Sequence, residues 1–133
     1  MFHKEEIIKS VLALSFRPQD YCVITGTALV MQGVKAETKD IDMSCSKEAF
    51  QSLLDQGYPV KQGDFARKVV YSEDIEIFED WHRGAITSID GVSVASLESV
   101  IQMKKQLGRE KDQLDIARIE GYLRNESKGT PEQ

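Results

Sequence analysis

Residues 21–45 read YCVITGTALVMQGVKAETKDIDMSC, and this stretch decides the fold because its hydrophobic pattern changes several times. The opening run is apolar and β-branched, which predicts a buried strand that ends at Gly26. Residues 28–31 favour a short helix that stops at Gly33. Residues 39–45 then alternate between acidic and apolar positions, as the residues of a strand do. The stretch therefore predicts strand, turn, helix and strand in that order.

Two acids, Asp40 and Asp42, stand one residue apart in the second predicted strand. Alternate strand residues project to one face, so both carboxylates are expected to point the same way. Such carboxylates repel each other unless a cation lies between them, and Mg²⁺ with a nucleoside triphosphate is the expected cation and ligand. Gly26 would let the backbone approach a phosphate, and the Thr27 hydroxyl would bind the terminal phosphates. The alternative is an ordinary turn followed by a solvated strand face.

A third acid, Glu76, lies between Ile75 and Ile77 in a predicted strand. A lone buried carboxylate is costly, so Glu76 should face a cation or water. If it shares the face of Asp40 and Asp42, it would complete a two-metal site or act as a general base. The alternative is a half-exposed strand with Glu76 in solvent.

The rest of the chain alternates between helical and strand patterns. Helices are predicted over residues 4–15, 47–56, from 97 onward and 110–124, and strands over 65–71, 75–79, 86–89 and 92–94. Asp90-Gly91 between the last two strands is a strong hairpin signal. This order predicts an α+β protein, with a mixed sheet, helices mainly on one side and two C-terminal helices. A single domain is expected over residues 1–124, followed by a disordered polar tail over 125–133.

A basic group lies near the break between the last two predicted helices. It consists of Lys104, Lys105, Arg109 and Lys111. Because a triphosphate needs positive partners, these side chains are candidates for binding it. The alternative is a solvated helix face on which they pair with Glu110, Asp112 and Asp115.

Composition limits the remaining classes. The 133 residues carry a formal net charge of -5, which argues against a protein that grips nucleic acid through a broad basic face. No apolar run approaches the roughly 18 residues of a membrane span, and the N-terminus lacks the pattern of a secretory signal. Cys22 and Cys45 have no metal-ligand spacing and are expected to be reduced, buried thiols in a cytoplasmic protein.

Taken together, Gly26-Thr27, Asp40-Ile41-Asp42 and Glu76 resemble the motifs of the DNA polymerase β-type nucleotidyltransferase superfamily. Residues 94–115 resemble small prokaryotic members, among them abortive-infection toxins and antibiotic nucleotidyltransferases. The resemblance implies Mg²⁺-dependent transfer of a nucleoside monophosphate from a nucleoside triphosphate, with ATP the expected donor, to an unidentified hydroxyl. Asp40 and Asp42 would hold the metal, and Gly26 and Thr27 the β- and γ-phosphates. Many relatives hold the acceptor on a further domain, so a homo-oligomer or a partner is expected to supply that surface here.

Other functions remain open at this stage. An inactive nucleotide-binding or toxin–antitoxin regulatory protein would keep the phosphate turn without turnover. A phosphohydrolase would use Asp40 as its nucleophile, but that chemistry favours an acid at the end of the first core strand. A purely structural protein is the last alternative.

Overall fold

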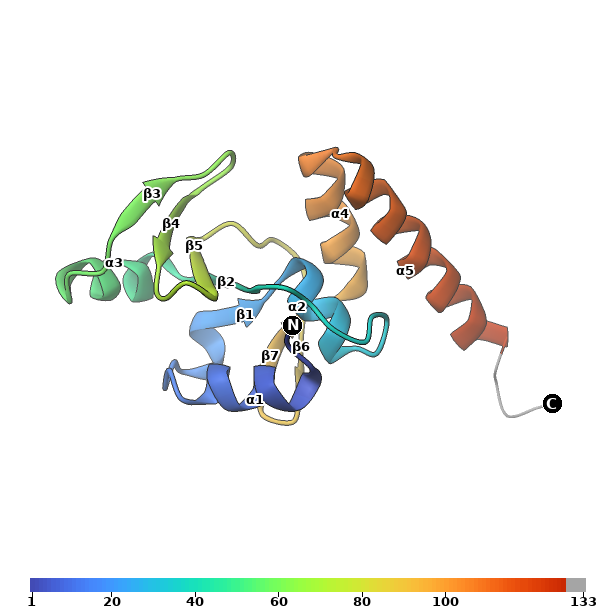
Figure 1. The fold of residues 1–133 in the computed structure, drawn as a ribbon, viewed down its shortest axis with the longest axis horizontal. Coiled ribbons are helices and arrows are strands. Elements are labelled where there is room, and N and C mark those ends of the chain that lie inside the picture. The colour runs from blue at the N-terminus through green and yellow to red at the C-terminus, as the bar shows by residue number, and fades with distance from the viewer. Residues whose placement is uncertain (129–133) are drawn as a thin grey trace.

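The computed structural model describes residues 1–128, in which seven strands form one mixed sheet (Figure 1). The helices are α1 (Lys4–Leu12), α2 (Thr25–Met31), α3 (Lys47–Asp55), α4 (Leu97–Leu107) and α5 (Glu110–Lys128), with a 3₁₀ turn at Pro18–Asp20. The strands are β1 (Tyr21–Val23), β2 (Ile41–Cys45), β3 (Val60–Gln62), β4 (Arg67–Val70), β5 (Ile75–Glu79), β6 (Ile86–Ile89) and β7 (Val92–Ala95). The expected α+β class is confirmed.

The strands lie in the order β3-β4-β5-β2-β1-β7-β6. Strand β2 runs parallel to β5 and antiparallel to β1, while β1 is parallel to β7. The outer pairs β3–β4 and β6–β7 are antiparallel hairpins. As a result, segments far apart in sequence meet at the centre of the sheet, where β1, β2 and β5 are neighbours.

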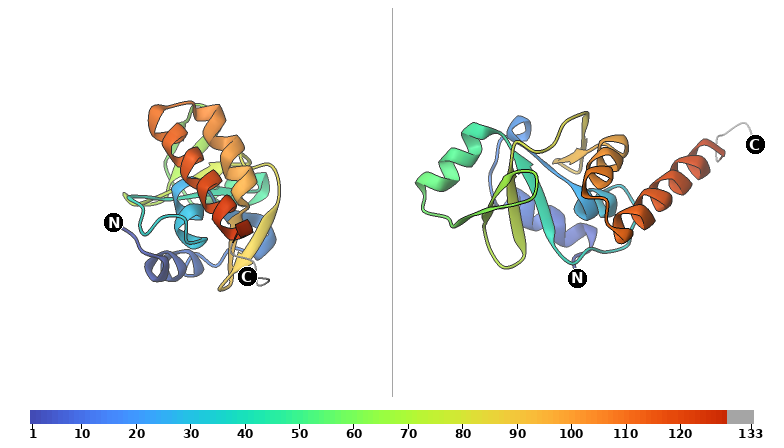
Figure 2. Two further views of the ribbon diagram at one scale, coloured as in Figure 1. Left: turned by 90° about the vertical axis from the view of Figure 1, so that its right-hand side faces the viewer. Right: turned by 90° about the horizontal axis from the view of Figure 1, so that it is seen from above.

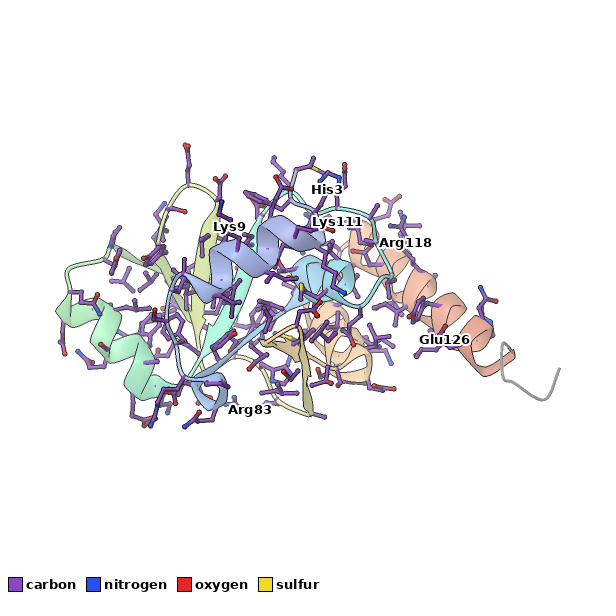
Figure 3. All side chains as sticks on the ribbon, turned by 90° about the horizontal axis from the view of Figure 1, so that it is seen from below. His3, Lys9, Arg83, Lys111, Arg118 and Glu126 are labelled. Carbon is purple, nitrogen blue, oxygen red and sulfur yellow. The ribbon has the colours of Figure 1, made fainter. Side chains whose placement is uncertain are left out.

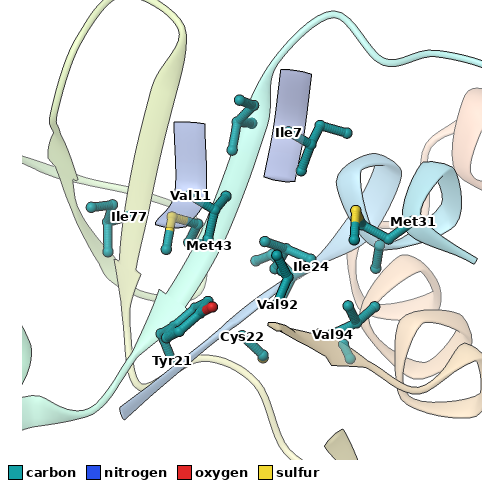
Figure 4. Packing of buried hydrophobic residues seen from close by; sticks show 14 of the residues in the cluster. Ile7, Val11, Tyr21, Cys22, Ile24, Met31, Met43, Ile77, Val92 and Val94 are labelled. Carbon is teal, nitrogen blue, oxygen red and sulfur yellow. The ribbon is translucent and has the colours of Figure 1, made fainter. Parts of the chain in front are cut away.

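The core lies on one face of this sheet, because alternate residues of β2 and β5 are apolar. Met43 and Ile77 are fully buried there, and Ile7 and Val11 of α1 pack on the same side (Figure 4). Helix α3 adds the fully buried Phe50 against β4 and β5. The expectation of helices mainly on one side is therefore confirmed for the central strands. Cys22 and Cys45 are buried and free, as expected.

Local signals place most element ends. Ser46 and Ser96 cap α3 and α4 through their side-chain oxygens. Gly108 ends α4 in the left-handed conformation, which brings α5 back along α4. Figure 2 shows both helices at one end of the sheet. Asp90 and Gly91 both have positive φ and form the hairpin turn between β6 and β7.

Several elements differ from the prediction: α1 ends at Leu12 rather than at residue 15, and α2 begins at Thr25, before the glycine that was expected to precede it. Strand β2 begins at Ile41, so Asp40 lies in the preceding bend. Strand β3 was not predicted, since all of its residues are exposed and carry no alternation. Helix α5 extends through Lys128, so the expectation of a disordered tail is wrong for residues 125–128. The sequence offers no helix breaker before Gly129. The remainder of that predicted tail lies outside the described residues.

None of the helices in residues 1–128 combines the length and apolar character that crossing a bilayer requires.

Candidate active site

A cleft of about 890 Å³ opens on the face of the sheet opposite the apolar core. Its floor is the centre of the sheet, where Asp42 and Glu76 line it. One wall is the tip of the β3–β4 hairpin at residues 62–66, and the other is the α4–α5 turn. Figure 1 shows these two walls on either side of the strands. The volume lies in the range of small-molecule and cofactor sites.

The acids at the floor are brought together by strand pairing. Asp42 of β2 and Glu76 of β5 are register partners in the parallel pair, so their side chains leave the same face. Asp40 also lines the cleft, but from the bend before β2, and it is exposed. The structure therefore places all three predicted acids around one cleft, two of them as direct neighbours.

The environment of Asp42 is unfavourable for a negative charge. The pKa of Asp42 is raised to about 6, mainly by burial; the hydrogen bond from Thr25 opposes the rise, and the nearby charges of Glu76 and Asp40 add to it. The Thr25 hydroxyl donates to Asp42 Oδ2 over 3.0 Å. Lys68 Nζ lies 3.0 Å from Glu76 Oε2 and supplies the nearest compensating charge. A cation between the carboxylates would favour ionised Asp42 for the same electrostatic reason.

The three acids do not form a closed metal cage. Among residues 1–128, no group of three or more His, Cys, Asp or Glu side chains is close enough to hold a metal ion. The expected roles of Asp40, Asp42 and Glu76 as metal ligands therefore stay a prediction. The buried Asp42 carboxylate with acidic neighbours still fits a cation such as Mg²⁺, which usually takes one or two carboxylates and completes its shell with phosphate oxygens and water.

The phosphate-binding role expected for Thr27 is wrong. Thr27 is fully buried, and its hydroxyl donates to the Asp40 carbonyl and accepts from the Asp42 amide. It fixes the backbone that carries the two acids. Thr25, two residues earlier, lines the cleft instead. Its backbone φ is 49°, which is an uncommon conformation for a β-branched residue. Strain of this kind often marks a functional site.

Gly26 lines the cleft beside Thr25, as expected. A Cβ on this residue would lie 2.9 Å from the Thr38 hydroxyl oxygen, so Gly26 also allows the loop before β2 to pack closely. That loop brings Lys39 and Asp40 to the cleft. Glycine at this position thus has a packing reason in addition to any role in binding.

Within residues 1–128, some of the basic residues expected to bind a triphosphate are paired with acids, and Lys111 is not. Lys104 is buried, with Nζ 3.2 Å from Asp112 and 3.0 Å from Asp115, and Arg109 pairs with Asp112 over 2.6 Å. Their charges are therefore largely committed to joining α4 and α5. Lys111 lines the cleft and has no ion pair among residues 1–128.

Several cleft residues escaped the sequence reading. Arg118 of α5 lies at the cleft with Lys111, and both are labelled in Figure 3. Lys68 of β4 is beside Glu76, and only strand pairing reveals that. Three aromatic residues also line this cleft: Phe65, Phe78 and Trp81.

The fold is similar to that of a solved protein from Thermotoga maritima described as a "putative nucleotidyltransferase". The two chains share 16% sequence identity. Their superposition has a TM-score of 0.58 and covers 94% of this chain and 96% of the other. No protein-family model and no curated protein matches the chain. The likeness confirms the expected nucleotidyltransferase fold, and a shared fold does not by itself assign an activity.

Proposed function

We propose that this protein is a metal-dependent nucleotidyltransferase, which moves a nucleoside monophosphate from a nucleoside triphosphate such as ATP to a hydroxyl acceptor. The observation that carries the proposal is the pairing of Asp42 with Glu76 at the floor of a cleft bordered by Lys111 and Arg118. Carboxylates beside basic side chains suit a ligand that combines a cation with phosphates. Resemblance to small prokaryotic toxins and antibiotic-modifying enzymes supports the same reaction class.

In this reaction the acceptor oxygen forms a bond to the α-phosphorus, and the bond from that phosphorus to pyrophosphate breaks. Glu76, held by Lys68, is positioned to take the proton of the acceptor hydroxyl. Asp42 and Asp40 would hold Mg²⁺, which when bound neutralises charge on the phosphates. Lys39, Lys111 and Arg118 line the cleft without an ion pair among residues 1–128 and are available to orient the triphosphate.

A second candidate is an inactive nucleotide-binding or regulatory protein on the same fold. The observation that favours it is the absence, among the described residues, of three acids close enough to share a metal ion. Such a protein would bind nucleotide in the cleft without releasing pyrophosphate. For an active enzyme, we propose that a second copy of the chain or a partner completes the acceptor surface.

Label transfer and binding separate the two candidates. Purified protein is incubated with Mg²⁺ and α-labelled nucleoside triphosphates over a panel of small-molecule, RNA and protein acceptors. We expect label transfer and pyrophosphate release, both lost with EDTA and reduced at least about 10²-fold in Asp42→Asn, which removes a metal-binding carboxylate. Asp74→Asn is the matched control, because Asp74 is an exposed acid next to β5 that does not line the cleft.

Nucleotide binding by calorimetry without any turnover would support the inactive candidate. Equal activity of Asp42→Asn and the unsubstituted protein would show that the site is wrongly assigned.

A further inference from the structure

An aromatic group made of Phe65, Phe78 and Trp81 lines one end of the cleft. The rings of Phe65 and Trp81 are nearly parallel, with 10° between their planes and 6.0 Å between their centroids. The Phe78 ring is tilted against Trp81 with centroids 5.0 Å apart. Phe65 at the hairpin tip is 49% exposed although it belongs to this group. A large apolar ring is thus left accessible inside a cleft that is otherwise polar and charged.

The aromatic group is connected directly to the acidic floor. Phe78 lies two residues after Glu76 in β5, so both side chains leave the same face of the sheet. Lys68 Nζ, which pairs with Glu76, also lies 5.6 Å from the centre of the Phe78 ring. A molecule that contacts Glu76 therefore has an aromatic surface within reach along the same strand.

Trp81 is held in place by its polar atoms. Its backbone amide donates to the Ser44 hydroxyl over 3.1 Å, and its indole Nε1 donates to Gln106 Oε1 over 3.1 Å. These bonds tie it both to the sheet and to α4. Because the indole nitrogen already has a partner, the ring offers a ligand its π surface rather than a hydrogen-bond donor.

We propose that the aromatic group binds the planar base of the nucleoside triphosphate by stacking; this inference rests on the proposed function. The carboxylates and basic side chains of the cleft suit a cation and phosphates, whereas the planar face of a base calls for a surface on which it can stack. The aromatic group supplies the missing complement in the same cleft. Stacking is tolerant of base identity, because every base has a π face.

The test uses the single tryptophan of the chain, since the emission of Trp81 reports this location alone. The full chain is titrated with MgATP and, separately, with Mg-tripolyphosphate, which has the phosphates but no base. We expect MgATP to bind at least about tenfold more tightly and to change Trp81 emission, whereas tripolyphosphate leaves the emission unchanged.

Two variants separate stacking from a structural role. Phe65→Ala and Phe65→Leu remove the ring, and the leucine keeps apolar volume at the hairpin tip. Each should weaken MgATP binding about tenfold while leaving tripolyphosphate binding unchanged. Val60→Ala is the matched control, because Val60 is an exposed apolar residue at the start of the same hairpin and does not line the cleft.

The outcomes distinguish this inference from the proposed function. If MgATP binds but the Phe65 variants weaken ATP and tripolyphosphate equally, the group is structural and the inference alone fails. If ATP binding is unchanged in the variants and only the Michaelis constant of an acceptor rises, the ring belongs to the acceptor and the assignment to the base is overturned. If neither MgATP nor tripolyphosphate binds, the proposed function fails and this inference with it.

Discussion

At the scale of single residues, Asp42 combines a structural cost with a proposed function. Its carboxylate is placed by the buried Thr27, which bonds the adjacent backbone, and it accepts a hydrogen bond from Thr25. Glu76 beside it adds a second negative charge. The metal-free protein therefore keeps an acid where its ionised form is disfavoured, as many active sites do.

This cost gives a pH dependence with a definite sign. Folding raises the pKa of Asp42 from 3.8 to about 6, so between these values the folded state binds more protons than the unfolded chain. The contribution of Asp42 to the free energy of unfolding therefore falls as the pH rises from about 4 to 6 and stays low above that. Asp42→Asn should then be more stable than the unsubstituted protein at pH 7.5, by at most about 3 kcal/mol.

Urea unfolding in EDTA at pH 4 and pH 7.5, followed by circular dichroism, measures this difference. The gain of Asp42→Asn should shrink to well under about 1 kcal/mol at pH 4, where Asp42 is almost fully protonated in the folded state and partly protonated in the unfolded chain. Asp74→Asn, at an exposed position, should show no such trend. If the stability of Asp42→Asn relative to the unsubstituted protein were lower at pH 7.5 than at pH 4, the raised pKa of Asp42 would be contradicted.

Predictions for single residues were better within strands, where the alternation of side chains applies, than in the turn after β1, where the sequence does not tell which threonine hydroxyl faces the cleft. The alternation placed Asp42 and Glu76 each within a strand, and the register of β2 with β5 then put them on one face, which the sequence had left open. Asp40, expected on the same strand face, lies in the bend before β2. The Thr27 hydroxyl was expected at the phosphates and Thr25 was given no role, because the orientation of both side chains depends on the turn between β1 and α2 and on the unusual φ of Thr25. No periodicity in a single sequence reports that angle.

At the scale of elements, a buried charge network joins α4 to α5. Asp112 is fully buried and accepts from the Lys104 ammonium, the Arg109 guanidinium and the Arg109 backbone amide. Burial opposes ionisation of Asp112, but the bonds from Arg109 and Lys104 outweigh it and lower its pKa. The network fixes the direction in which α5 leaves the turn, and thereby the position of Lys111 at the cleft.

Breaking this network should be costly. Asp112→Asn removes one of the two carboxylates that compensate the buried Lys104 and leaves Asp115 in place, so we expect a loss of about 1.5–3 kcal/mol in the free energy of unfolding at pH 7. Glu110→Gln, at an exposed position two residues before Asp112, is the control and should change stability by less than about 0.5 kcal/mol. Because the folded pKa of Asp112 is lowered, the difference between parent and Asp112→Asn should shrink as the pH falls below about 4.

Chemical unfolding over a pH series tests this. A cost that stays constant down to pH 2 would mean that charge is not the cause. The sequence indicated both readings of the basic group, ligand binding and pairing along the helix. It could not choose between them, because the choice depends on how closely α4 packs on α5.

Elements themselves were predicted where a cap, a turn or an amphipathic pattern marked them. The helices expected from residues 47 and 97 begin there, after the capping residues Ser46 and Ser96, and Asp90-Gly91 forms the expected hairpin turn. Strand β3 went unseen because it is an exposed edge whose residues follow no pattern, and it forms only by pairing with β4. Its hairpin supplies one wall of the cleft, so the extent of the site was also beyond prediction.

At the scale of the whole molecule, the cleft exists only because three distant parts of the chain meet. The centre of the sheet, the β3–β4 hairpin and the α4–α5 turn each contribute residues to it. A nucleotide that bridges them would link the stability of all three. Binding to the folded state alone raises stability in proportion to the logarithm of free ligand over its dissociation constant.

Bound MgATP should therefore raise the thermal midpoint of the whole domain. At a concentration about 100 times the dissociation constant, the gain is about 2.7 kcal/mol, which corresponds to about 10 °C for a chain of this size. The shift should be absent with ATP in EDTA and with Mg²⁺ alone, because the proposed site needs cation and phosphates together. Circular dichroism and Trp81 emission should report the same midpoint if the walls and the sheet unfold as one unit. If Trp81 emission changed at a lower temperature than the circular dichroism signal, the hairpin wall would open separately and the cleft would not be preformed.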